Sequence, residues 1–115
     1  MTDCVFCRIA AGEIPANVVA RSEDAVAFRD LNPQAPTHVL VVPLAHLANA
    51  AAADSEAGER VLGHTLRFAV QVAAQLGLTE GGYRLVLNNG KNGGQSVDHL
   101  HVHILGGRRM TWPPG

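Results

Sequence analysis

Residues 99–105 constrain the fold more than any other part of the chain, because they alternate strictly between two kinds of side chain. The histidines are His99, His101 and His103, and the aliphatic residues between and after them are Leu100, Val102 and Ile104. Successive side chains of a β-strand point to opposite faces of its sheet. The pattern therefore predicts a strand with an aliphatic face toward the core and, on the other face, a row of imidazoles about 7 Å apart.

Three imidazoles at this pitch suit two kinds of site. They can coordinate a metal ion, or they can surround a phosphoryl group, with one neutral ring nitrogen attacking phosphorus and protonated neighbours donating to its oxygens. Three ligands from one strand diverge too far to hold a tetrahedral ion without further ligands. A solvated strand face that is rich in histidine by chance is the remaining interpretation. The spacing favours the phosphoryl site.

The rest of the chain predicts an α+β domain with an antiparallel sheet of about five strands. The expected strands are residues 18–21, 25–30, 38–42, 83–88 and 99–105. A short helix is expected over residues 5–11, before Gly12. One long helix is indicated by apolar residues that recur at steps of three and four, capped by Asp54 or Ser55 and ended by Gly77: Leu62, Leu66, Ala69, Ala73 and Leu76. Residues 31–37 and 90–94 have loop composition, and the tail at residues 108–115 can continue neither helix nor strand.

Composition narrows the class of ligand. A chain of 115 residues predicts one domain, and 47% hydrophobic residues suffice for its core. Nine basic residues against ten acidic ones give no basic footprint for nucleic acid. No apolar run is long enough for a membrane span, and the N-terminus does not resemble a signal peptide. We expect a cytoplasmic protein that binds a small anionic molecule through local groups.

The chain has two cysteines, Cys4 and Cys7, separated by two residues. In a reducing compartment this spacing favours metal or redox chemistry over a structural disulfide. The pair would supply half of a Cys2His2 zinc site, with His46 and His99 as the candidate remaining ligands. The alternatives are two reduced, buried cysteines in the first turn of a helix, or a redox pair, although no strand precedes Cys4.

Residues 94–107 closely resemble the signature of the histidine-triad (HIT) superfamily, His-x-His-x-His followed by apolar residues. Four further stretches resemble its HINT branch, the histidine-triad nucleotide-binding proteins: Glu13-Ile14-Pro15, residues 30–38, Gly93-Gly94-Gln95-Ser96, and Trp112-Pro113-Pro114-Gly115. The resemblance covers nearly the whole chain and implies a single HIT domain over residues 1–115. The cysteine pair is similar to that of many bacterial relatives, which bind zinc through such a set, whereas the eukaryotic HINT pattern commonly lacks it.

The resemblance implies hydrolysis of purine nucleoside phosphoramidates or acyl-nucleotides through a covalent nucleotidyl-histidine. It makes His101 the nucleophile, with its second ring nitrogen oriented by a backbone carbonyl. His103 and His38 would bond the phosphate oxygens, and Ser96 would help protonate the leaving amine. The implied binding residues are Asn88, Gly94 and Gln95 for the phosphate, Asp30 for the ribose hydroxyls, Trp112 for the leaving-group side of a partner's site, and Val5, Phe6, Ile9 and Leu31 for the purine.

Several alternatives stay open at this point. Asp30 can instead cap the turn at Asn32 and Pro33, and His99 can serve zinc or the phosphate. HINT proteins are two-fold dimers, and either the long helix or an exposed strand can form that contact. Two other functions are a dinucleoside polyphosphate hydrolase or nucleotidyltransferase, and a nucleotide-binding, zinc-stabilised interaction protein with incidental turnover. The glycine loop lacks the Lys-Ser/Thr ending of a P-loop, so no magnesium requirement is expected. The physiological substrate, the pathway and the choice between adenine and guanine are left open.

Overall fold

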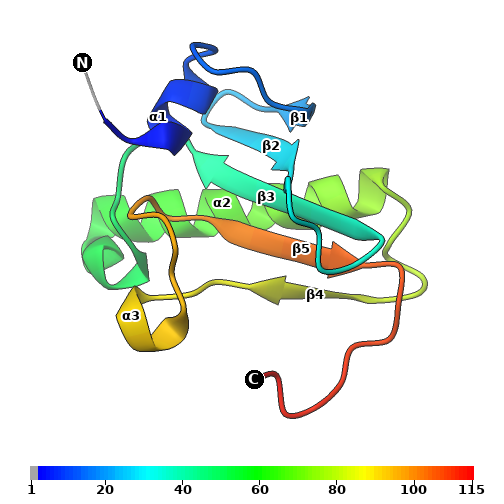
Figure 1. The fold of residues 1–115 in the computed structure, drawn as a ribbon. Helices are drawn as coiled ribbons and strands as arrows, with labels where there is room; N and C mark the ends of the chain where they lie inside the picture. The colour runs from blue at the N-terminus through cyan, green and yellow to red at the C-terminus, as the bar shows by residue number, and fades with distance from the viewer. Residues whose placement is uncertain (1–2) are drawn as a thin grey trace.

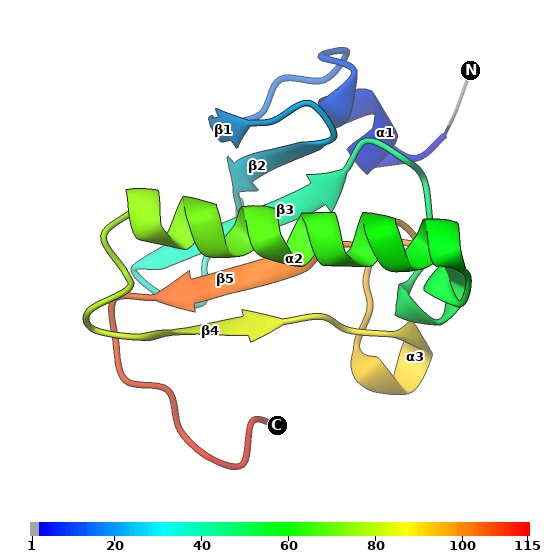
Figure 2. The same cartoon turned by 180° about the vertical axis from the view of Figure 1, so that it is seen from behind.

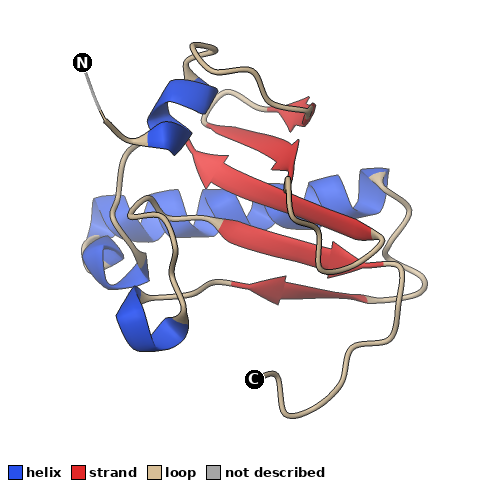
Figure 3. Ribbon diagram, in the orientation of Figure 1, coloured by secondary structure: helices blue, strands red, loops and turns tan. Residues whose placement is uncertain are grey.

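The computed structural model describes residues 3–115 and contains one five-stranded antiparallel sheet (Figures 1 and 3). Its order is β1-β2-β3-β5-β4, so β5 is inserted between β3 and the edge strand β4. The elements are α1 Val5–Ala10, β1 Val18–Arg21, β2 Ala25–Arg29, β3 Thr37–Pro43, the 3-10 turn η1 Ala50–Ala53, α2 Glu56–Gln75, β4 Tyr83–Val86, α3 Gly90–Gly93 and β5 Val102–Gly106. The expected α+β class, the five strands, the long helix and the short N-terminal helix are confirmed.

The two faces of the sheet are covered by different helices. The long helix α2 crosses one face, as the view from behind shows (Figure 2). The short helix α1 packs its Phe6 and Ile9 on the other face, against Phe28 and Leu40. Because both faces of β3 are buried, its side chains form a continuous apolar run instead of alternating with polar ones. Functional groups therefore have room only where α1 leaves its face of the sheet open.

The register of β3 and β5 places two distant histidines together. Leu40 lies opposite His103, and His38 lies opposite Leu105. Directly opposed residues share a face, so His38 and His103 both point to the α1 side of the sheet. Val39 and Val41 point to the other side and join the core under α2.

The long helix begins as predicted, and the predicted apolar stripe faces the core: Ala69 and Ala73 are buried, and Leu66 and Leu76 pack against the core cluster. The buried face is wider than predicted. The Ser55 hydroxyl caps it by accepting from the Gly58 amide at 2.9 Å. Leu62 and Leu66 are only half-buried, while Thr65, Phe68 and Val72 are buried. Thr65 tolerates burial because its hydroxyl donates to the Val61 carbonyl at 2.7 Å. In the part of the chain that the structure describes, no helix is long and apolar enough to cross a membrane.

The final strand is shorter than predicted, and this difference matters for function. β5 begins at Val102, so His99 and His101 precede it: His99 ends a bend over residues 97–99, and His101 directly precedes the strand. The reason is a change of partner, because the Leu100 amide donates to the Leu47 carbonyl at 2.6 Å instead of pairing with a strand. The predicted alternation still holds. The aliphatic residues on one side of the segment are at most 1% exposed: Leu100, Val102 and Ile104.

Two further expectations are wrong in their boundaries. The predicted strand over residues 83–88 ends at Val86, so Asn88 lies beyond it. The predicted loop at residues 90–94 contains the helical turn α3, which ends at Gly94 with a left-handed φ of 80°. The turn forms because the Gln95 side chain accepts from the Gly90 amide at 2.8 Å, a contact between side chain and backbone that composition does not reveal.

Candidate active site and metal centre

Three histidines meet on the α1 side of the sheet. His38 comes from β3, His103 from β5, and His101 from the segment just before β5. His38 Nε2 lies 2.9 Å from His103 Nδ1. The ring centroids of His101 and His103 are 5.0 Å apart, closer than the backbone spacing suggests, because the rings tilt toward each other at 60°. The structure thus brings together three of the predicted catalytic residues.

The environment of His101 selects one form of its imidazole. Its Nδ1 lies 2.7 Å from the carbonyl oxygen of His99, and a carbonyl only accepts, so Nδ1 donates and carries the hydrogen. Nε2 of the neutral ring then keeps its lone pair. The side chain is 4% exposed, and the Phe6 ring packs edge-on against it at 5.1 Å between centroids. His101 therefore has the tautomer that a nitrogen nucleophile needs.

His38 and His103 form a hydrogen-bonded relay with defined tautomers. The Gln34 amide donates to His38 Nδ1 at 3.0 Å, so the hydrogen of His38 lies on Nε2. That Nε2 donates to His103 Nδ1, which leaves the hydrogen of His103 on its own Nε2. Asp30 Oδ2 is 3.4 Å from His38 Nε2. The relay therefore ends in an N–H donor on His103.

Both relay histidines are neutral donors near neutral pH. Burial, followed by the neighbouring His101 and His38, lowers the pKa of His103 to about 4, and Asp30 opposes the shift. Burial also lowers the pKa of His38, again against the attraction of Asp30. The phosphoryl site expected from the spacing had protonated neighbours. The structure supports neutral neighbours. The free energy that the charged rings lose by desolvation is larger than the attraction that the single Asp30 carboxylate supplies.

A hollow of ≈ 320 Å³ opens beside these histidines. Its walls include the residues expected for a nucleoside: Val5, Phe6, Ile9, Asp30, Leu31 and Ser96. Leu31 is 98% exposed, so its aliphatic surface has no cover from the described residues. Asp30 Oδ1 accepts from the Asn32 amide at 2.8 Å, so the turn-capping role considered for Asp30 is present. Its second oxygen still faces His38.

The other predicted binding residues lie elsewhere. Gln95 uses its side-chain amide within the protein, donating to the carbonyls of Ala48 and Val97. Gly94 is exposed at the end of α3. Asn88 lines a separate hollow of ≈ 450 Å³ together with Arg84 and Arg108. Trp112 is 83% exposed, so it does not anchor the tail to its own chain.

A second cluster is formed by the two cysteines and two histidines of the predicted metal site. Cys4 caps α1 and Cys7 lies one turn later, while His46 follows β3 and His99 precedes β5. His99 Nδ1 is 3.3 Å from Cys4 Sγ, 3.4 Å from Cys7 Sγ and 3.1 Å from His46 Nδ1. Cys7 Sγ is 3.3 Å from His46 Nδ1. The structure thus brings all four predicted ligands together.

The donor set fits a tetrahedral Zn²⁺. Zn–N and Zn–S bonds of about 2.0 and 2.3 Å give tetrahedral edges of about 3.3–3.8 Å, close to the observed separations. His99 Nε2 donates to the Pro43 carbonyl at 2.9 Å, so its Nδ1 lone pair faces the sulfurs. Burial lowers the pKa of His99, against the raising effect of that carbonyl, which favours the neutral ligand. An orienting carbonyl of this kind is the usual second partner of a zinc-bound histidine.

Asp30, His38 and His103 also bring their potential ligand atoms within 4.8 Å of one another. This group differs from the cysteine cluster because two of its nitrogens already bond each other at 2.9 Å. A donor nitrogen that carries hydrogen has no lone pair for a metal. The three residues therefore form a hydrogen-bonded relay rather than a ligand set.

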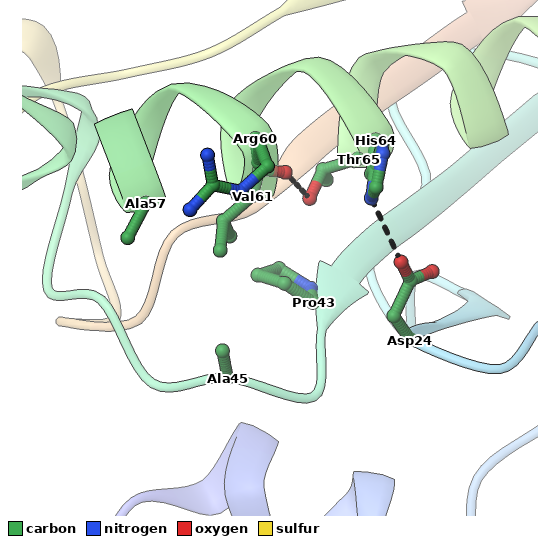
Figure 4. A pocket seen from close by; sticks show the side chains of 8 residues that line it. All are labelled: Asp24, Pro43, Ala45, Ala57, Arg60, Val61, His64 and Thr65. Carbon is green, nitrogen blue, oxygen red and sulfur yellow. Dashed lines mark hydrogen bonds and ion pairs between the residues drawn. The ribbon is translucent and has the colours of Figure 1, made fainter. Parts of the chain in front are cut away.

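A further hollow of ≈ 250 Å³ lies between α2 and the chain around Pro43 (Figure 4). Here His64 Nδ1 pairs with Asp24 Oδ2 at 3.0 Å, and both side chains are more than half exposed. This exposed pair links α2 to the turn that precedes β2.

The resemblance implied that a backbone carbonyl orients His101, and the structure confirms this, but it did not identify the groups that orient the imidazoles. They are backbone atoms of Gln34, Pro43 and His99, which carry no side-chain signature. Backbone groups act through their position alone, so any residue type can supply them. Only the folded chain reveals which carbonyl or amide each ring meets.

Known proteins resemble this chain over almost its whole length. A HIT domain model matches residues 11–110. A 14 kDa zinc-binding protein of Zea mays is 51% identical, and the match covers 96% of this chain and 87% of that protein. A HIT family hydrolase from Legionella pneumophila Philadelphia 1 has the same fold, with a TM-score of 0.93, 50% identity, and coverage of 98% of this chain and 100% of that one.

A histidine triad nucleotide-binding protein from Candida albicans is more distant, with a TM-score of 0.77, 30% identity, and coverage of 96% of this chain and 83% of that one. The family model, the relatives and the histidine geometry agree. The chain therefore belongs to the HIT family.

Proposed function

We propose that this protein hydrolyses purine nucleoside phosphoramidates or acyl-nucleotides through a nucleotidyl-histidine formed on His101. The observation that carries the proposal is the 2.7 Å hydrogen bond from His101 Nδ1 to the His99 carbonyl. It leaves a nucleophilic lone pair on Nε2 of a buried ring, next to a hollow lined by apolar residues and a carboxylate. The hydrolase in Legionella and the nucleotide-binding relative in Candida support this class of substrate.

The reaction has two steps. In the first, His101 Nε2 forms a bond to phosphorus while the bond from phosphorus to the amine or acyl oxygen breaks, and the leaving group takes a proton from Ser96. In the second, water attacks phosphorus and gives a proton back to Ser96, the bond to Nε2 breaks, and the free nucleotide leaves. Throughout, the Nε2–H group of His103 donates to the phosphoryl oxygens, where negative charge develops, and His38 supports it by donating to His103 Nδ1.

The nucleoside occupies the hollow between α1 and the turn after β2. The second oxygen of Asp30 accepts ribose hydroxyls, and the base lies between Phe6, Ile9 and Leu31. An aliphatic side chain that is 98% exposed gains apolar burial when a base covers it. Asn88 and Gly94 would approach the phosphate from the segment around α3, and Gln95 would act indirectly, by holding that segment through its bonds to Gly90, Ala48 and Val97.

The cysteine cluster holds one structural zinc ion, with Cys4, Cys7, His46 and His99 as ligands. Thiolate and imidazole ligands without a solvent position are typical of structural zinc rather than catalytic zinc. When bound, the ion would cross-link α1 to the segment that follows β3 and to the segment that precedes β5. The zinc-binding relative in Zea mays supports this assignment.

The protein acts as a homodimer in which Trp112 reaches the partner's leaving-group side. Two observations support this: Trp112 is 83% exposed, and β4 is an edge strand of the sheet. An exposed tryptophan in an ordered tail gains most by packing against another surface. Light scattering of the dilute protein should give twice the chain mass. A monomer mass would remove Trp112 from any shared site.

The decisive experiment follows the covalent intermediate. The full chain is mixed with an adenosine phosphoramidate and quenched early, and the intact mass is measured. We expect a nucleotidyl adduct on the parent and on the control variant His64→Asn, and none on His101→Asn. Undiminished turnover by His101→Asn would remove His101 as the nucleophile. Binding without any turnover in the parent would instead favour an interaction protein, and release of a nucleotide from dinucleoside polyphosphates alone would favour the other hydrolase class.

A further inference from the structure

The active site and the cysteine cluster are physically joined at His99. Its Nδ1 faces Cys4 and Cys7, and its carbonyl oxygen accepts from His101 Nδ1 at 2.7 Å. The same residue therefore offers its side chain to one site and its backbone to the other. With 0% of His99 exposed and its Nε2 bonded to Pro43, the residue has little freedom to move independently of its ligands.

A second connection runs through α1. Cys4 and Cys7 bracket this helix's first turn, and Phe6 lies between them in the sequence. The Phe6 ring contacts both His99 and His101, with centroid separations of 6.0 and 5.1 Å. Phe6 and Ile9 also line the ≈ 320 Å³ hollow. The position of α1 thus defines both a wall of the hollow and one side of the nucleophile.

This helix has little stability of its own. It spans six residues, and isolated helices shorter than about 12–15 residues are marginal in water. Its start is capped by the Cys4 sulfur at 3.4 Å from the Cys7 amide, a weak acceptor for a cap. Other contacts that hold α1 include apolar packing of Phe6 and Ile9 on Phe28 and Leu40 and a bond from Arg21 to the Ala10 carbonyl. Ligation of both cysteines would hold α1 in its place.

From these contacts we infer that His99 is a positioning residue for His101, and that an ion in the cysteine cluster organises the nucleoside hollow. Occupancy of the cluster sets the direction of the His99 carbonyl, and with it the ring nitrogen of His101 that carries hydrogen. The same occupancy fixes Phe6 and Ile9 against the bound nucleoside. The inference rests on the proposed function for the identity of His101 as nucleophile, and it concerns geometry rather than a step of the reaction.

The test compares the full chain loaded with one equivalent of Zn²⁺ and the same chain stripped with a chelator. Calorimetry gives the Kd for AMP, and long-range ¹H–¹⁵N spectra of histidine-labelled protein report which nitrogen of His101 carries hydrogen. We expect stripping to weaken AMP binding at least about tenfold, as loss of an outer-shell partner does in metal sites. It should also convert the single Nδ1–H form of His101 into a mixture.

Two variants refine the comparison. His46→Ala removes the exposed ligand, which contacts Cys7 and His99 but takes no part in the hydrogen bond between His101 and the His99 carbonyl. In this variant AMP affinity should rise with added Zn²⁺ in parallel with metal occupancy. His64→Ala is the matched control, because it removes an exposed histidine whose partner is Asp24 (Figure 4). It should leave AMP affinity and the His101 tautomer unchanged with and without metal.

The outcomes separate the two proposals. A stripped chain that stays folded by circular dichroism, with unchanged AMP affinity and His101 tautomer, would overturn this inference and reduce the ion to a stabiliser. A chain that takes up no Zn²⁺ would overturn it as well. If stripping unfolds the parent, the Zn²⁺ titration of His46→Ala replaces the stripped chain. AMP affinity and a His101 tautomer that do not change with metal occupancy would then overturn the inference. Metal-dependent AMP binding without any turnover would overturn the proposed function and leave the inference standing.

Discussion

His99 and His101 are two residues apart and almost fully buried, yet they present opposite nitrogens to their surroundings. His99 donates from Nε2 to the Pro43 carbonyl, so its lone pair is on Nδ1. His101 donates from Nδ1 to the His99 carbonyl, so its lone pair is on Nε2. The first lone pair faces two cysteine sulfurs, and the second is left for a substrate.

The difference shows that the function of a buried histidine depends on which of its nitrogens meets a carbonyl. An uncharged imidazole has one donor and one acceptor, so a fixed acceptor on one side determines the chemistry of the other. The two carbonyls come from different parts of the chain, since Pro43 is 56 residues from His99 while His99 is two residues from His101. A repeated motif therefore presents one lone pair on Nδ1 and one on Nε2, as the proposed zinc ligand and the proposed nucleophile require.

Replacing each histidine separately gives the largest contrast. His101→Asn should reduce turnover by roughly 10⁴-fold or more, because the variant lacks the attacking nitrogen. Its zinc content should stay at one ion per chain, since the cysteine cluster is intact. His99→Asn should lose the ion. Metal analysis and single-turnover kinetics on both variants check the contrast, and equal metal loss in the two would break it.

Replacing one proposed zinc ligand should strongly reduce the stability of the fold and leave His101, the proposed nucleophile, in place. For Cys7→Ser, losing zinc present at a thousandfold over its Kd costs about 4 kcal/mol, which corresponds to a Tm lower by roughly 10–20 °C. Thermal unfolding with and without chelator measures this effect. Chelator should destabilise the parent to the level of the variant and have no further effect on the variant. An unchanged Tm of the parent after metal removal would contradict the zinc assignment.

Lowering the pH should reduce the stability of the fold through His103, the third histidine of the motif. The pKa of His103 is about 4 in the folded chain against 6.5 in the unfolded one, so between these values the unfolded chain binds more protons. This contribution to stability is fully present above pH 6.5 and is lost as the pH falls toward 4. His101 and His38 and the carboxylate of Asp30 face the same ring and shape the slope.

The corresponding measurement is urea unfolding of the parent and His103→Asn over this pH range. Between pH 6.5 and 4 the variant should lose less stability than the parent. Part of the dependence of unfolding free energy on pH should remain, because burial also lowers the pKa of His38. Parallel curves for the two proteins would show that His103 is not protonated differently on unfolding.

The smallest effect is expected at Leu31, which contacts neither the Pro43 carbonyl nor the His99 carbonyl. Leu31→Ala should change the free energy of unfolding by no more than about 0.5 kcal/mol, because exposed side chains contribute little. AMP affinity should fall a few-fold, since burying part of a leucine side chain is worth about 1 kcal/mol. Calorimetry and urea unfolding test the two halves separately. An unchanged AMP Kd would remove Leu31 from the nucleoside hollow.

The fold class and the grouping of Cys4, Cys7, His46 and His99 could be predicted from the chain alone. Alternation in residues 99–105 predicted the buried face, and the spacing of Cys4 and Cys7 predicted a metal cluster that includes His46 and His99. Both predictions depend on patterns that are local in sequence. Strand boundaries at Asn88 and at the start of β5 were wrong. At β5 the reason is a long-range bond, from the Leu100 amide to the Leu47 carbonyl, which no local pattern reveals.

The sequence by itself determined which side chains share a face, because backbone geometry alternates them whatever the surroundings. Only the tertiary structure decided that His99 turns its lone pair to the cysteines and that His101 keeps its own for a substrate. It also decided that His38 and His103 are neutral, through burial and through a hydrogen bond between strands. These properties depend on carbonyls and amides that distant parts of the chain supply, and on the desolvation that results when those parts pack together. No local pattern encodes them.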